Sequence, residues 1–131
     1  MAFNLEEKYL VETENALGAK LPDSYRLAMM KNNGGTVDAV DDDWELIPIL
    51  DAADRKRLAR SCNDILKETA SFREWRGFPA DAVVIAENGS GDCIVFIRDG
   101  DRFNPQPHVW SHETRALVKI GDDFSALGVH G

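Results

Sequence analysis

The sequence predicts an α+β fold in which a mostly antiparallel, twisted sheet of about five or six strands packs against N-terminal and central helices. Three observations lead to this prediction. The 131 residues, of which 44% are hydrophobic, suffice for one core, so residues 1–131 are expected to form a single domain. Helical spacing of apolar residues dominates the first half of the chain, and β-branched runs joined by short turns dominate the second half. Because these strands follow one another directly, we expect antiparallel pairing.

Two helices are predicted near the N-terminus. Apolar residues occupy one side of residues 5–17, and Gly18 is placed to end that helix. Residues 23–31 are expected to form a second, shorter helix. Pro22 suits its first position, and the run Asn33-Gly34-Gly35 is expected to supply a left-handed cap at its end.

The middle of the chain combines an acidic segment with a helix. Residues 32–54 contain no Lys or Arg. Within them, residues 44–49 alternate weakly, and Pro48 limits them to an edge strand or to the end of a strand. Residues 58–75 carry apolar side chains at three- and four-residue steps, which predicts one long helix and leaves open a break near residues 61–63.

The strongest strand signal lies in residues 83–97. Two runs rich in β-branched residues flank a loop that presents Glu87, Asn88, Ser90 and Asp92. The central strands carry apolar residues on both faces, so both faces of the sheet are expected to be buried or used for binding.

The rest of the chain extends this pair into a meander of four strands. Asp99-Gly100-Asp101 is a predicted tight turn, and residues 108–111 and 116–120 are two further predicted strands. Residues 122–128 are expected to form an acid-capped final helical turn, and the last residues are expected to be loose.

Charge and composition restrict the function. Fifteen Lys and Arg against 23 Asp and Glu give a net charge of -8, which disfavours nucleic acid and anionic lipid and favours a basic partner. The N-terminus lacks the pattern of a signal peptide and no apolar stretch reaches the roughly 20 residues of a membrane span, so we expect a cytoplasmic protein. Cys62 and Cys93 lie in apolar patterns without metal-type spacing and are expected to be reduced, buried thiols.

The sequence predicts no cofactor and no metal site. A strand follows Gly89-Ser90-Gly91, whereas a phosphate loop or a nucleophile elbow leads into a helix, so Ser90 is expected to be a turn residue. His108 and His112 are four residues apart in an extended segment, a separation of about 13 Å that is too long to hold one ion without a bend. The run Asp41-Asp42-Asp43 lacks the spacing of a calcium loop.

The acidic run is a candidate protein-binding surface. It precedes Trp44 directly, and an aromatic ring among carboxylates is a suitable anchor for a basic protein surface. A solvated acidic loop is the alternative interpretation. The residues predicted to contact a partner are Asp41, Asp42, Asp43, Trp44, Glu87, Asn88, Asp92 and Trp110.

Four stretches in a fixed order carry a family resemblance. They are Leu17-Gly18 through Leu21-Pro22 with Tyr25, the run Asn33-Gly34-Gly35, the loop from Ile85 to Asp92 with its following strand, and His108 to Glu113 leading to Phe124. In these features the chain resembles the SUKH superfamily, specifically the branch of the fungal cell-wall assembly regulator and of many bacterial immunity proteins. The resemblance implies an α+β domain and, in bacteria, a protein that binds and neutralises a toxin, frequently a nuclease. It implies no catalytic residues.

Three functional hypotheses follow from the sequence. The first is a non-catalytic, cytoplasmic immunity-type protein that neutralises a cognate toxin, with a basic nuclease as the expected partner. The second is a regulatory or scaffolding module that binds other proteins and has no toxin partner. The third is a small hydrolase that uses Glu87, Asp92 and either His108 or His112, which requires these side chains to converge in one pocket.

Overall fold

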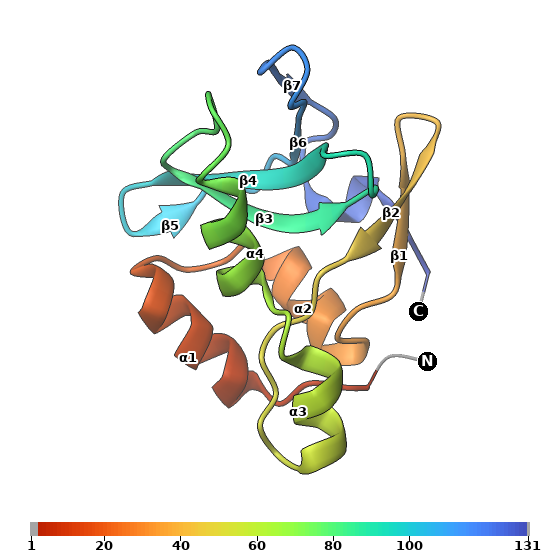
Figure 1. Cartoon of the computed structure of the whole chain (residues 1–131). Helices are drawn as coiled ribbons and strands as arrows, with labels where there is room; N and C mark the ends of the chain where they lie inside the picture. The colour runs from red at the N-terminus through yellow and green to blue at the C-terminus, as the bar shows by residue number, and fades with distance from the viewer. Residues whose placement is uncertain (1–2, 131) are drawn as a thin grey trace.

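The computed structural model describes residues 3–130, and this part of the chain is an antiparallel sheet packed against helices (Figure 1). The elements in chain order are α1 Glu7–Leu17, α2 Asp23–Lys31, β1 Thr36–Ala39, β2 Asp42–Leu46, α3 Arg55–Ser61, α4 Ile65–Phe72, β3 Ala82–Glu87, β4 Cys93–Asp99, β5 Arg102–Phe103, β6 His108–Trp110, β7 Leu117–Lys119, the 3-10 helix η1 Phe124–Ala126 and β8 Gly128–His130. The predicted α+β fold is confirmed.

The sheet is larger than predicted. Its described strands run in the order β7-β6-β4-β3-β2-β1-β8, with β5 paired to β4, and the named pairs are all antiparallel. The meander of β3, β4, β6 and β7 is as expected. Residues 128–130 are not loose, because β8 pairs with β1. With β1 and β8 outside it, β2 is an internal strand, so the edge-strand alternative is wrong. The other alternative, the end of a strand, agrees with the structure, because β2 ends at Leu46 and Pro48 lies just beyond it.

The helix boundaries follow from the capping residues. Gly18 takes a left-handed φ of 75° and ends α1 as predicted. Pro22 precedes α2 instead of occupying its first position, and Asn32 at the end of α2 is extended, so the predicted left-handed cap is wrong there. The break that the sequence left open near residues 61–63 is present, and it divides the predicted helix of residues 58–75 into α3 and α4. Asp54 and Asp64 each accept a backbone N–H of the following helix, and this capping starts α3 and α4 separately.

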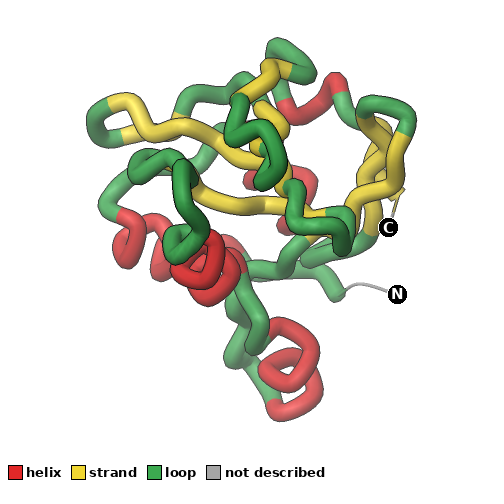
Figure 2. Tube along the Cα trace, turned by 45° about the horizontal axis from the view of Figure 1, so that its top comes forward, coloured by secondary structure: helices red, strands yellow, loops and turns green. Residues whose placement is uncertain are grey.

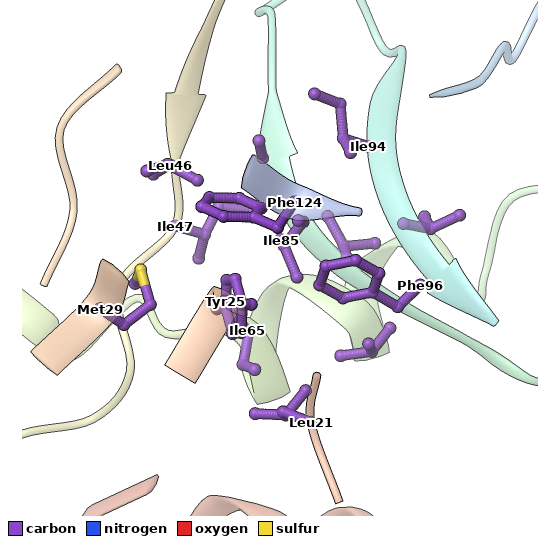
Figure 3. Close-up of a cluster of buried hydrophobic side chains, with 14 of the residues drawn as sticks. Leu21, Tyr25, Met29, Leu46, Ile47, Ile65, Ile85, Ile94, Phe96 and Phe124 are labelled. Atoms are coloured by element: carbon purple, nitrogen blue, oxygen red, sulfur yellow. The ribbon is translucent and has the colours of Figure 1, made fainter. Parts of the chain in front are cut away.

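Both faces of the central strands are buried, as predicted. On one face, Tyr25 of α2 makes edge-on ring contacts with Phe96 of β4 at 5.4 Å and with Phe124 at 5.3 Å (Figure 3). On the other face, Trp110 of β6 packs edge-on against Phe72 of α4 and against Phe78. These contacts fix the central strands, and therefore the loop between β3 and β4.

Neither cysteine is in a disulfide, and their environments differ. Cys93 is buried in β4, and burial raises the pKa of its thiol. Cys62 is only half-buried, so the expectation of a buried thiol is wrong at that position. The reason is that Cys62 lies in the break between α3 and α4 rather than on the buried side of a continuous helix.

Candidate functional site

The acidic run forms the tip of a β-hairpin. Strands β1 and β2 are joined by Val40 and Asp41, whose φ values of 51° and 57° are those of a type I′ turn. This turn leaves Asp41, Asp42 and Asp43 exposed to solvent. The three aspartates also line an open concavity together with Asp38 and Ala39.

The loop between β3 and β4 lies against this hairpin. Asn88 donates a hydrogen bond from Nδ2 to the Asp42 carboxylate at 3.1 Å. The Asn88 amide oxygen accepts hydrogen bonds from the Ser90 backbone N–H and hydroxyl, which forms a tight local turn and gives Ser90 the turn role expected of it. The structure therefore brings two separately predicted segments together. We call the hairpin tip (residues 38–43) and the β3–β4 loop (residues 87–92) the acidic end.

A group of carboxylates extends the acidic end along the sheet. Glu87 lies directly opposite Glu45 in the β2–β3 pair, and Glu68 of α4 is also close to it. Burial, reinforced by the negative charges of Glu68 and Glu45, raises the pKa of Glu87. A cationic group from a partner would relieve this repulsion.

The other side of the β3–β4 loop is tied to the turn after β6. Asp92 accepts from His112, with its Oδ1 atom 3.0 Å from His112 Nδ1 and 3.3 Å from the His112 backbone nitrogen. Gly91 has a φ of 97° and lies so close to the imidazole that an added Cβ atom would be 2.8 Å from Nδ1. The exposed ring of Trp75 meets the same imidazole edge-on at 5.3 Å. These contacts give Asp92 a positioning role within the loop.

The two tryptophans of the predicted contact set lie in the core. Trp44 is only 3% exposed, because strand alternation in β2 turns it inward while its acidic neighbours face solvent. Its indole Nε1 donates to the Ala39 carbonyl at 3.0 Å, and this hydrogen bond stabilises the hairpin on its buried side. Trp110 is fully buried. The expectation that either ring is presented to a partner is therefore wrong, and both support the surface from within.

Of the described side chains required for a hydrolase, only Asp92 and His112 are seen to pair with each other. Among residues 3–130, no hydrogen bond or ion pair found joins Glu87 to Asp92 or to either histidine, and the His108 Nδ1 atom lies 3.0 Å from the Gln106 carbonyl oxygen. Within the same residues, no group of three or more His, Cys, Asp or Glu side chains is placed to hold a metal ion. None of the helices in this part of the chain is long and apolar enough to span a bilayer.

The sequence analysis missed a second charged region. Helix α3 carries Arg55, Lys56, Arg57 and Arg60, none of which was predicted to be a functional residue. Their density was the available signal, since four basic residues occur within six positions directly after an acidic segment. Glu45, Glu68 and His112 were also not predicted as parts of the acidic end. They reach it through strand pairing and packing that no local pattern encodes.

Fold and surface define a small α+β protein whose most distinctive exposed feature is a charged end built on paired strands. The chain belongs to the SMI1 / KNR4 family (SUKH-1), whose profile matches residues 4–127. The resemblance to the SUKH superfamily is thereby confirmed, and membership is consistent with an immunity-type protein and with protein–protein interaction. No curated protein and no solved structure matches the chain.

Proposed function

We propose that this chain is a cytoplasmic immunity-type protein that binds a cognate toxin of an interbacterial toxin system and neutralises it without catalysis. The partner we expect is a basic nuclease domain. The contact surface is the acidic end, with Asp41, Asp42, Asp43, Glu87 and Asn88 facing the toxin. Asp92 holds the loop, while Trp44 and Trp110 hold the strands beneath it.

The observation that supports this proposal best is the hydrogen bond between Asn88 and Asp42, which are 46 positions apart in the chain. It joins the hairpin and the loop into one surface, so that their carboxylates are presented together. A nuclease binds the phosphates of its substrate with cationic groups, and a fixed set of carboxylates competes for those groups. The net charge of -8 adds long-range attraction, which raises the association rate.

The proposal is tested with the nuclease region of a toxin encoded beside this gene. We compare the double variant Asp41→Lys/Asp42→Lys with Asp81→Lys/Asp99→Lys, which makes the same charge change at exposed positions away from the acidic end. The first variant is expected to lower the association rate about tenfold or more at low salt. It should also fail to protect cells that express the toxin, whereas the control protects them. Equal effects of the two variants would remove the acidic end from the proposal.

The regulatory or scaffolding function is the alternative outcome of the same experiment. If no toxin gene lies beside this one and the wild-type protein rescues no cell from a nuclease toxin, toxin neutralisation is ruled out as the function. Proteins that co-purify with the chain then identify the partner of the module.

A further inference from the structure

The sheet has an open edge at β7. Strand β7 stands at the end of the strand order and, among the described strands, pairs only with β6, and both views show it at the margin of the molecule (Figures 1 and 2). All three of its residues are exposed, including Leu117 at 41% and Val118 at 56%. We call residues 116–120, which continue β7 by one residue at each end, the β7 edge. An exposed apolar edge of this kind is a template for pairing with a further strand.

The hydrogen bonds to β6 show which backbone groups of the β7 edge point outward. The Ala116 carbonyl accepts a bond of 3.2 Å from the residue that follows β6, and the Ile120 N–H donates a bond of 3.0 Å to the residue that precedes β6. Bonded and non-bonded positions alternate along an antiparallel pair, so Val118 also bonds inward, whereas Leu117 and Lys119 present their N–H and C=O groups outward. Among the described residues, no backbone bond to these outward groups is found.

The β7 edge has little of the protection that keeps sheet edges from pairing. It contains no proline and one charged residue, Lys119. The ammonium of Lys119 lies 2.7 Å from the Asp122 carboxylate, so its charge is balanced within the chain. Leu117 and Val118 lie on opposite faces of the strand, because side chains alternate. A second strand therefore meets backbone partners at its edge and an apolar side chain on each face.

We propose that two copies of this chain associate through their β7 edges, antiparallel and around a two-fold axis at Val118. In this register Leu117 of each copy lies opposite the partner's Lys119, and each of these two pairs exchanges two backbone hydrogen bonds. The two Val118 side chains meet at the axis as a non-hydrogen-bonded pair, the kind in which side chains approach most closely. The two sheets become one continuous sheet.

The charges at the two ends of the β7 edge favour a second copy as the occupant. Arg115 precedes the edge, and no ion pair of its guanidinium is found among the described residues. Asp122 follows the edge, is 89% exposed and meets Lys119 through Oδ1, which leaves its second oxygen for another cation. The proposed register places Arg115 opposite the partner's Gly121 and beside the partner's Asp122. Glu113, Arg115, Lys119 and Asp122 sum to no net charge, so they select neither an acidic nor a basic strand of another protein.

The interface is small and independent of the acidic end. The pairing involves only residues 116–120 of each copy, which is well below the size of a stable interface, so we expect a dissociation constant of about 10 µM to 1 mM. The β7 edge shares no residue with the acidic end. This proposal and the proposed function therefore succeed or fail separately.

Sedimentation equilibrium of the full chain at about 0.15 M salt tests the association, since the net charge of -8 on each copy is then screened. Val118→Lys sets two like charges at the axis and should raise the dissociation constant at least about tenfold. Leu27→Lys makes the same change at a 66% exposed position of α2 and should alter it less than about twofold. Equal losses in the two variants would overturn the proposal. So would a wild type that stays monomeric up to about 2 mM, which would favour a strand of another protein as the occupant.

A mixture of two variants tests the position of the axis. Val118→Glu, like Val118→Lys, should associate poorly alone. An equimolar mixture of the two should associate at least about fivefold more tightly than either variant, because opposite charges then face each other across the axis. Thermal melting establishes that both variants are folded. A mixture that associates no better than its components would contradict the register.

Amide hydrogen exchange tests the backbone pattern without any substitution. Exchange of the wild-type chain is carried out at low and at high protein concentration, quenched, and read residue by residue by NMR. The N–H groups of Leu117 and Lys119 should exchange at least about threefold more slowly at high concentration, whereas that of Val118, already bonded to β6, should change little. Exchange at Leu117 and Lys119 that does not depend on concentration would show that the β7 edge stays open and would overturn the proposal.

Discussion

The acidic end and helix α3 are the two charged regions of this molecule, and they are supported in different ways. The carboxylates of the acidic end are placed by strand register, with Ala39 opposite Asp42 and Glu45 opposite Glu87. Helix α3 is attached largely through one buried carboxylate, Asp51, and its partner Arg57. A run of charged residues in a sequence therefore indicates a charged surface. Only the structure shows which of those residues, such as Arg57, hold the fold together.

The largest effect is expected where the support of α3 is removed. Asp51→Ala leaves the Arg57 guanidinium without its buried partner, which should lower the free energy of unfolding by about 2–4 kcal/mol. Urea denaturation measures this loss. Amide hydrogen exchange should accelerate in α3 before it does in the β1–β2 hairpin, because the hairpin is held independently.

A matched variant separates the buried ion pair from the helix cap. Asp54 also faces Arg57, at 3.7 Å, but its side chain is 60% exposed and caps α3 through the Arg57 backbone N–H. Asp54→Ala should therefore cost about 1 kcal/mol, the usual value of an N-cap. A larger loss in Asp54→Ala than in Asp51→Ala would contradict the view that the buried pair anchors the helix.

A substitution at the hairpin tip is expected to stabilise the protein. Val40 is 61% exposed and has a φ of 51°, a left-handed conformation that a β-branched residue adopts at a cost. Val40→Asn supplies the residue type that this turn prefers and should stabilise the protein by about 1 kcal/mol. Thermal unfolding measures the gain. Val118→Asn, an equally polar change at an exposed strand position, should give no such gain, and equal stabilisation by both would contradict the strain at Val40.

The link between the hairpin and the loop is expected to contribute less than the buried ion pair that anchors α3. Asn88→Ala removes the hydrogen bond to Asp42 together with the local turn to Ser90, and should cost about 0.5–1.5 kcal/mol. Asn88→Asp keeps the acceptor for Ser90 but sets a carboxylate against Asp42. Chemical denaturation of both variants at low and high salt tests this difference. As the salt concentration rises, only the loss of stability in Asn88→Asp should become smaller, because only this variant adds repulsion between two negative charges.

Local sequence patterns predicted several of the helices and strands. They did not predict which side chains of β2 face the core and which face solvent. The runs around residues 83–97 predicted β3 and β4 because each carries enough β-branched residues to be recognised alone. The short strands β1 and β8 were missed, since their pairing joins residues 36–38 to 128–130 and has no local signal. Pro48 suggests an edge strand or a strand end for residues 44–49, and without β1 and β8 the internal position of β2 could not be predicted. The same omission hid the alternation that turns Trp44 inward and leaves Asp42 and Asp43 outside.

The smallest effect is expected from the carboxylate pair at the base of the acidic end. Because burial, Glu68 and Glu45 raise the pKa of Glu87, the folded protein binds a proton there more readily than the unfolded chain does. Stability should therefore fall as pH rises from about 4.3, the ordinary Glu value, through the raised pKa of the folded state. Glu87→Gln removes this charge and should stabilise the protein at pH 7 by roughly 0.2–1 kcal/mol, the range for like charges across a strand pair.

The pH profile of that variant distinguishes repulsion from a simple packing gain. At a pH well below about 4.3, where the Glu87 carboxyl is protonated in both the folded and the unfolded chain, wild type and Glu87→Gln should be equally stable, and the difference should open as the pH rises. Exposed Glu113→Gln is the control and should show no such divergence. A constant gain at every pH would mean that Glu87 is not held against its negative neighbours. The acidic end would then lack the repulsion that a cationic partner is expected to relieve.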